Sequence, residues 1–173
     1  MHEREQATRR SWKVRTATAE DRDAILRVHA RSVRETVSAH YTREQIEAWA
    51  AFPPPHGHEQ ALRSGRVFVA EDEGGILGYG QFDAKTGEVE ATYVLPEAHG
   101  RGVGRALLAE SEARARRAGF RSIFLSASLN AVPFYERAGF EAQVKRFYEL
   151  PGGLHLECMF MIKQLDSPPA DAG

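Results

Sequence analysis

A glycine-rich turn between a predicted strand and a predicted helix constrains this chain more than any other feature. Residues 88–94 form a predicted strand, Pro96 follows, and the run 99–104 reads His-Gly-Arg-Gly-Val-Gly before a helix that begins at Val103. Glycines let successive backbone N–H groups converge, and a helix N-terminus adds positive potential. The segment therefore predicts a backbone anion site, with a diphosphate as its natural ligand. A plain tight connection is the alternative interpretation.

Two common phosphate-binding motifs do not fit this turn. A P-loop ends in Gly-Lys-Ser/Thr, whereas Gly104, Arg105 and Ala106 provide neither the lysine nor the metal-binding hydroxyl. The Rossmann fingerprint needs a further glycine where this chain has Leu107, and it follows a parallel strand, whereas the strands here are predicted to be antiparallel hairpins. A nucleotide-binding module is therefore disfavoured.

The surrounding pattern predicts a mixed α/β domain with a central, mostly antiparallel sheet flanked by helices. Capping boxes at 18–21 and 42–45 precede amphipathic segments, and the prolines at 53–55 end the second helix near Ala51. Glycine-containing turns at 72–75 and 85–87 favour three consecutive antiparallel strands. The predicted order is βααβββαβαββ, with strands at 12–15, 66–70, 76–82, 88–94, 123–125, 144–150 and 155–162, and helices at 24–33, 43–51, 103–118 and 131–137.

Length and charge limit the possible function classes. At 173 residues and 42% hydrophobic residues, the chain is expected to form one domain over 12–165, between tails at 1–11 and 166–173. Its 23 Lys and Arg against 24 Asp and Glu create no overall field for nucleic acid or an anionic membrane. No apolar run reaches the roughly 18 residues of a membrane span, and the first residues lack a signal-peptide core, so a cytoplasmic location is expected.

Cysteine and histidine usage predicts neither a disulfide nor a metal centre. Cys158 is the single cysteine and is expected to be a buried thiol. Because it lies far along the chain from the predicted sites, a thiol nucleophile is not expected. His56 and His58 stand in a Pro/Gly loop without the further ligands that a metal site requires, so no metal is assigned.

Three blocks of the sequence resemble the GNAT superfamily of N-acetyltransferases, in the family's order and spacing and over about residues 14–165. They are Tyr-Val-Leu-Pro at 93–96, the glycine run at 99–104, and 128–140 with Phe-Tyr-Glu-Arg-Ala-Gly-Phe at its end. The resemblance implies the GNAT fold, acetyl-CoA as co-substrate, a pantetheine arm beside the strand that ends at 93–94, and a pyrophosphate on the glycine run. The residues it implies for acetyl-CoA are Tyr93, Val94, Leu95, His99, Gly100, Arg101, Gly102, Val103, Gly104, Arg105, Ala106, Ser128, Asn130 and Phe134.

The chain departs from the family pattern at two of these positions. His99 stands where the family usually has Gln or Arg, and Ser128 replaces the usual Asn, with Asn130 nearby but out of register. If His99 contacted phosphate, its charge would change near neutral pH, and Arg101 or Arg105 would supply the permanent cation. The alternative is a surface histidine beside a phosphate that main-chain amides hold.

Acetyl transfer to an amine needs a proton acceptor and a proton donor for the departing thiolate. Tyr135 stands where the resemblance places the thiolate-protonating tyrosine; ordinary aromatic packing is the alternative. Glu88 and Glu90 alternate with Val89, which predicts both carboxylates on one strand face. Glu90 is slightly preferred as the base, because similar bacterial members often have an acidic residue there. A solvated face is the alternative.

The acceptor is expected to be a primary amine of a small molecule or peptide, bound near the first two helices. Tyr41 and Trp49 are the candidate substrate-binding residues, although the helical spacing of Trp49 also suits a core position. A non-catalytic acyl-CoA sensor on the same fold is the competing hypothesis. Pairing of two copies as a homodimer is left open.

Overall fold

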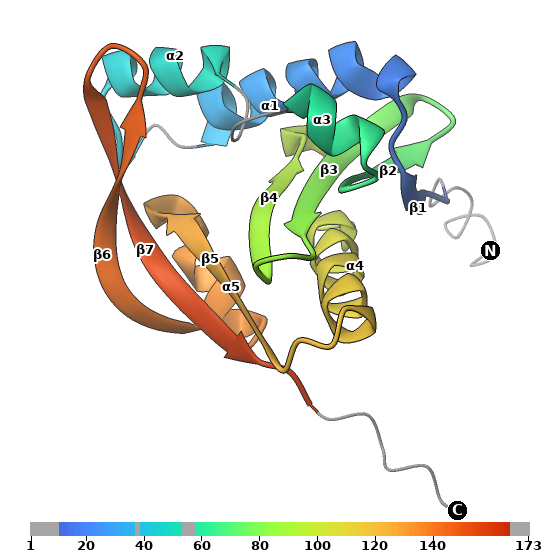
Figure 1. The fold of residues 1–173 in the computed structure, drawn as a ribbon. Helices are drawn as coiled ribbons and strands as arrows, with labels where there is room; N and C mark the ends of the chain where they lie inside the picture. The colour runs from blue at the N-terminus through green and yellow to red at the C-terminus, as the bar shows by residue number, and fades with distance from the viewer. Residues whose placement is uncertain (1–10, 37–38, 53–57, 167–173) are drawn as a thin grey trace, which may run out of the picture.

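A seven-stranded sheet runs through the computed structural model, which describes residues 11–36, 39–52 and 58–166 (Figure 1). Neighbouring strands are antiparallel, except that β4 and β5 run parallel. The predicted mixed α/β fold with three consecutive antiparallel strands is confirmed. In sheet order the strands are β1 (Lys13–Thr16), β2 (Val67–Asp72), β3 (Gly75–Asp83), β4 (Glu88–Val94), β5 (Ser122–Ser128), β7 (Leu154–Gln164) and β6 (Glu141–Leu150).

The helices follow the local signals in the sequence with one exception. At α2, Thr42 and Gln45 form the predicted reciprocal capping box, with the Thr42 amide donating to the Gln45 side chain over 2.8 Å. The helices are α1 (Arg22–Thr36), α2 (Arg43–Ala51), α3 (His58–Arg63), α4 (Val103–Arg117) and α5 (Val132–Arg137), with 3-10 turns η1 (Ala19–Asp21), η2 (Pro96–Ala98) and η3 (Leu129–Ala131). No helix in the described ranges is long and apolar enough to cross a membrane.

Helix α3 is the exception, because the sequence interpretation assigned His58 to a Pro/Gly loop. That assignment is wrong: His58 begins a six-residue helix that buries Ala61 and Leu62. Both side chains pack against α1 and strands β2 to β4. Tertiary burial stabilises a helix that is too short to form on its own. His56 and most of the predicted tails, 1–10 and 167–173, lie outside the described residues.

Helices cover both faces of the sheet (Figure 1). One buried cluster joins α1 and α3 to β2, β3 and β4, and another joins α4 and α5 to the opposite face. Helix α4 lies directly on β3, since a Cβ at Gly78 would be 3.1 Å from the Leu107 side chain and 2.7 Å from the Tyr93 carbonyl oxygen. A glycine at position 78 is therefore required for this close packing.

Strands β4 and β5 part soon after they begin, as the widening gap in Figure 1 shows. Their register holds one residue pair, Glu88 with Phe124. At the far end, α2 packs against the β6–β7 hairpin, where Gln45 donates to the His155 carbonyl oxygen over 2.8 Å. Because β4 and β5 diverge, each has an unpaired edge in the middle of the sheet. Helix α2 and the β6–β7 hairpin close one end of the opening between these two strands.

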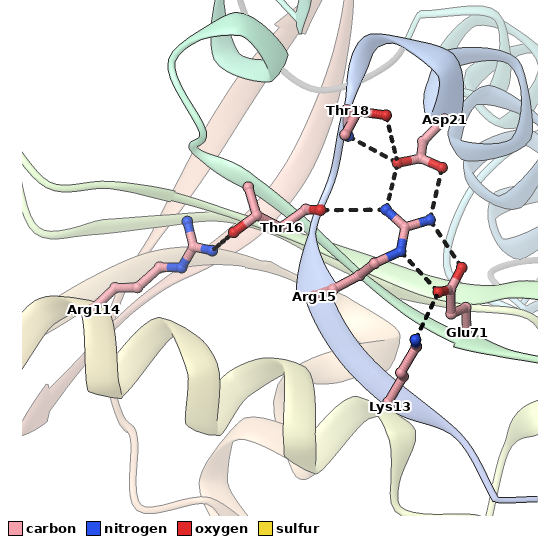
Figure 2. Close-up of polar contacts among 7 residues, drawn as sticks. All are labelled: Lys13, Arg15, Thr16, Thr18, Asp21, Glu71 and Arg114. Carbon is pink, nitrogen blue, oxygen red and sulfur yellow. Dashed lines mark hydrogen bonds and ion pairs between the residues drawn. The ribbon is translucent and has the colours of Figure 1, made fainter.

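The short edge strand β1 is held by an arginine between two carboxylates (Figure 2). Arg15 donates to both oxygens of Glu71 on β2, each over 2.8 Å, and to both oxygens of Asp21 in η1, over 2.8 and 2.9 Å. Asp21 also accepts from the Thr18 amide and so completes the predicted cap. The network ties β1 to β2 and to the start of α1.

Candidate active site

A cleft opens where β4 and β5 part, with about 930 Å³ of empty space including its open mouth. Residues 88–93 of β4 line one wall and residues 125–128 of β5 line the other. The cleft brings together both predicted glutamates, the predicted tyrosine and both predicted acceptor-binding residues. The remaining lining side chains are Tyr41, Trp49, Phe52, Ala131, Tyr135, Tyr148, Leu156 and Cys158.

The glycine run forms an open turn at the start of α4. Gly100 and Gly102 have φ angles of +77° and +80°, which side chains other than glycine's rarely adopt. A Cβ at either position would meet nothing within 4 Å, so the backbone is accessible there. Gly102 is the N-cap residue of α4, whose first turn has no acidic side chain. Unpaired N–H groups of that turn suit an anionic ligand.

The basic side chains of the run differ in their surroundings. Arg105 is exposed on the first turn of α4, whereas the Arg101 guanidinium lies 3.5 Å from the Asp72 carboxylate. The His99 ring donates from Nε2 to the Val94 carbonyl oxygen over 3.3 Å, and therefore contacts the main chain of β4. This contact favours the interpretation in which His99 is a surface residue beside a site built from amides.

The other residues implied for acetyl-CoA surround the parting of the two strands. Beyond Glu88, the edge of β4 toward β5 has no ladder partner in the described part of the chain. Asn130 has a buried Oδ1 without a hydrogen-bond partner in the structure, which is an acceptor available to an N–H group. The Phe134 ring packs on the first turn of α4, 3.4 Å from where a Gly104 Cβ would be. The Tyr93 ring is stacked on Tyr79 at 5.4 Å, and the two residues are also paired in the β3–β4 ladder.

Tyr135 is both a core residue and a cleft residue. Its ring makes edge contacts with Phe134 at 5.1 Å and Phe140 at 5.6 Å, and only 7% of the residue is exposed. Burial raises the pKa of its phenol, while the neighbouring Thr92 side chain lowers it. The phenol is therefore protonated at neutral pH, as a proton donor must be.

Glu90 is held by two neighbours. Arg66 donates from Nη2 to both carboxylate oxygens over 2.5 and 2.6 Å, and Gln81 donates to Oε2 over 2.7 Å. The strand register is irregular here, because Gln81 pairs with Ala91 and the next residue, Phe82, pairs with Val89. Glu90 is left without a partner opposite it. The predicted strict alternation therefore fails at Glu90, although both glutamates line the cleft.

Glu88 has a different environment from Glu90. No side chain or amide among the described residues donates a hydrogen bond to its carboxylate, which is half-buried. Burial raises the pKa of Glu88, and the nearby Glu90 and Asp83 carboxylates raise it further, against a smaller opposing effect of Arg66. A half-buried carboxylate with a raised pKa and no hydrogen-bond donor is suited to accept a proton.

Tyr41 and Trp49 belong to a buried cluster and also line the cleft. The Tyr41 hydroxyl donates to the Glu157 carbonyl oxygen over 2.6 Å and accepts from the Leu129 amide over 3.0 Å. The Trp49 indole donates to the Tyr93 hydroxyl over 3.3 Å. These hydrogen bonds therefore join α2, and the segment just before it, to β4, β7 and η3.

The sequence did not point to three further cleft residues, Phe52, Tyr148 and Cys158. They come from the end of α2 and from β6 and β7, which long-range pairing brings to the cleft, so no local signal could have identified them. Cys158 is buried as predicted and, although it is far along the chain from the predicted sites, it lines the cleft. Burial raises the pKa of its thiol, which disfavours the nucleophilic thiolate. No group of three potential metal ligands occurs in the described ranges.

The chain is similar to proteins that are named as acetyltransferases. The family model of an acetyltransferase (GNAT) domain matches residues 37–155. The chain is also 30% identical over 137 residues to YafP, an uncharacterised N-acetyltransferase of Escherichia coli K12, and the match covers 76% of this chain and 83% of that protein.

Solved structures share the fold. A GCN5-related N-acetyltransferase from Rhodopseudomonas palustris matches with a TM-score of 0.77 and 25% identity, over 88% of this chain and 95% of that chain. YncA, a putative acetyltransferase of Salmonella typhimurium solved with acetyl-CoA, matches with a TM-score of 0.62 and 27% identity, over 94% of this chain and 99% of that chain.

Proposed function

Because this chain belongs to the GNAT family of N-acetyltransferases, with acetyl-CoA as its co-substrate, we propose that it acetylates a primary amine of a small molecule or peptide by direct attack. The observation that carries the proposal is the cleft between β4 and β5. It places a buried phenol, Tyr135, and a half-buried carboxylate, Glu88, in one space.

The residues present suit the co-substrate. The open backbone at Gly100 and Gly102 and the first turn of α4 would hold the pyrophosphate, with Arg105 as a nearby cation. The unpaired edge of β4 and the buried Asn130 oxygen would bind amide groups of the pantetheine arm. When bound, acetyl-CoA supplies an activated thioester.

Direct attack requires two proton movements. A nitrogen–carbon bond forms, the carbon–sulfur bond breaks, the nitrogen loses a proton and the sulfur gains one. We assign proton acceptance to Glu88, directly or through one water, and proton donation to the Tyr135 hydroxyl, which recovers its proton from solvent. The raised pKa values of both groups support these roles. No covalent intermediate on the protein is needed.

Glu90 has a supporting role in this scheme. The sequence favoured it slightly as the base, but its oxygens are occupied by Arg66 and Gln81. These hydrogen bonds leave the Glu90 oxygens less available to a substrate proton than those of Glu88. Glu90 instead adds negative charge beside Glu88, which raises the affinity of Glu88 for a proton and attracts a cationic substrate.

The proposal is tested by release of free thiol from acetyl-CoA across a panel of primary amines, with acetyl-CoA binding measured in parallel by calorimetry. Amine-dependent thiol release and an acetylated product in the mass spectrum are expected. Tight binding of acetyl-CoA with no turnover on any amine would contradict the proposal and favour the sensor hypothesis.

Pairing of two copies is included in the proposal at the β6 edge of the sheet. Val144 and Phe147 are exposed on this strand, which has a neighbour on one side only. Exposed apolar side chains on an edge strand favour strand-to-strand association. Light scattering at rising protein concentration is expected to show a dimer; a constant monomer mass would contradict the pairing.

A further inference from the structure

The charges that line the cleft are all negative. Glu88 and Glu90 are its charged lining residues, and no Lys, Arg or His of the described segments lines it. The nearest guanidinium, Arg66, is 2.5 Å from Glu90 and 3.5 Å from Asp83. Three carboxylates therefore share one cation. A cationic ammonium group is attracted here, whereas a carboxylate on the acceptor would be repelled by Glu88 and Glu90.

Two aromatic residues of the cleft, Tyr41 and Trp49, already use their polar atoms within the protein. Tyr41 uses its hydroxyl on two main-chain groups, and Trp49 uses its indole N–H on Tyr93. The two rings meet edge to face at 5.5 Å. These two residues therefore present ring surfaces to the cleft, which bind apolar groups and cations.

The mouth of the cleft continues the aromatic lining. Phe52, at the end of α2, is 48% exposed, and Tyr148, on β6, is 40% exposed. Both line the cleft, although neither belongs to a buried cluster. Large exposed aromatic side chains gathered at a cleft indicate contact with a ligand.

We infer that the acceptor is a monocationic amine with a flat apolar body, such as an arylalkylamine, and that amines carrying a carboxylate are rejected. This inference rests on the proposed function and specifies its substrate class. The ammonium group would lie at Glu88, which takes one proton from it and releases that proton to solvent. The resulting neutral amine attacks and loses its second proton during acetyl transfer. The apolar body would lie against the aromatic lining toward Phe52.

Matched amines test the inference with the full-length chain and acetyl-CoA. Phenethylamine and phenylalanine share one body and differ by a carboxylate, while propylamine lacks the ring and glucosamine replaces it with hydroxyls. We expect kcat/KM for phenethylamine to exceed that for phenylalanine by roughly 100-fold, and those for propylamine and glucosamine by about tenfold.

Two identical substitutions provide a structural control. Phe52→Arg places a cation at the cleft mouth, whereas Phe147→Arg places it on an exposed part of β6 that does not line the cleft. Phe52→Arg is expected to lower the phenethylamine to phenylalanine ratio by roughly tenfold, mainly through KM, with acetyl-CoA affinity unchanged. Phe147→Arg should leave the ratio unchanged.

The possible failures are distinguishable. Equal or better turnover of phenylalanine, glucosamine or the polyamine spermidine would overturn the substrate class and leave the acetyltransferase function intact. An unchanged ratio in Phe52→Arg would also overturn the class. Absence of thiol release with every amine, while acetyl-CoA still binds, would overturn the proposed function together with the inference.

Discussion

Two carboxylates two residues apart on β4 differ because of what surrounds each. Burial, Glu90 and Asp83 raise the pKa of Glu88. A carboxyl group with a raised folded pKa contributes stability that is fully present below its unfolded pKa and lost as the pH rises through the folded pKa. At pH 8 the ionised Glu88 therefore destabilises the fold. We predict that Glu88→Gln raises the melting temperature at pH 8 and lowers kcat by roughly 100-fold.

The matched control is Glu90→Gln, which makes the same carboxylate-to-amide change two residues further along β4. Arg66 would then keep Asp83, at 3.5 Å, as its carboxylate partner. The loss of a close charge pair should lower the melting temperature. Thermal unfolding and steady-state turnover on the same preparations compare the two variants. A Glu88→Gln variant that keeps full turnover would remove Glu88 from the mechanism.

Removing the hydroxyl oxygen of Tyr135 tests its role in catalysis separately from acetyl-CoA binding. Tyr135→Phe keeps the ring that packs on Phe134 and Phe140 and removes the hydroxyl. We predict at least a roughly tenfold loss of kcat, because a general acid contributes about that much or more, with little change in acetyl-CoA affinity. Calorimetry and thiol release measure the two quantities. Unaltered turnover would exclude the phenol as the proton donor.

At the scale of elements, one buried histidine joins two helices to the sheet. The His29 Nε2 on α1 lies 2.9 Å from the Trp49 carbonyl oxygen on α2, which can only accept, so Nε2 carries the proton. Nδ1 is then free to accept from the Tyr79 hydroxyl on β3, 3.2 Å away. This neutral ring fixes α2, and with it the Trp49 wall of the cleft.

Acid is predicted to loosen this connection. Burial lowers the pKa of His29 to about 4, from an ordinary value of 6.5. A group with a lowered folded pKa stabilises the fold above its unfolded pKa, and that stability is lost as the pH falls toward the folded pKa. Between pH 6.5 and 4 we expect a loss of up to about 3 kcal/mol in the free energy of unfolding, measured by urea denaturation.

His29→Gln is the control, because the amide can donate and accept but does not titrate. It should be less stable than wild type at pH 7, and the difference should shrink toward pH 4. Parallel stability curves for the two proteins would show that His29 does not carry the acid sensitivity.

Elements defined by local signals could be predicted, and those defined by distant contacts could not. The Thr42 cap and the glycine run before α4 depend on neighbouring residues, so the sequence identified both. Helix α3 depends on burial of Ala61 and Leu62 under α1, which no periodicity in six residues reveals. The irregular register at Glu90 depends on β3. The cleft was accordingly predicted along β4 and missed along β6 and β7.

At the scale of the whole molecule, the sheet consists of two antiparallel halves with little pairing between them. Strands β1 to β4 form one antiparallel half, and β5, β7 and β6 form the other, with one residue pair between them at Glu88 and Phe124. Helix α2 also joins the halves, since its cluster includes side chains from the β6–β7 hairpin. The cleft lies at the junction of the two halves. Contacts at the outer edge of the first half are therefore expected to affect the stability of the fold and to leave acetyl transfer unchanged.

Arg15, on the outer edge of the first half, provides the test of that separation (Figure 2). The Arg15 guanidinium is the largest influence that lowers the pKa of Asp21 and of Glu71. Arg15→Met leaves both carboxylates without it. Because these groups are partly exposed, solvent screening reduces the cost, and we predict a loss of about 1–2 kcal/mol in the free energy of unfolding at pH 7, with kcat unchanged.

The pH dependence and a neighbouring lysine make this prediction specific. Stability that arises from lowered carboxylate pKa values is present above the unfolded pKa and is lost as the pH falls through the folded pKa. The difference in stability between Arg15→Met and wild type should therefore shrink below about pH 4. Lys13 is 3.8 Å from Glu71 and 74% exposed, and Lys13→Met should change the stability by less than about 0.5 kcal/mol. Urea unfolding at pH 7 and pH 3 measures both variants. Arg15 contacts β2 and η1 and does not line the cleft. If kcat fell in Arg15→Met as much as in Glu88→Gln, the β1 edge and the cleft would therefore be energetically linked.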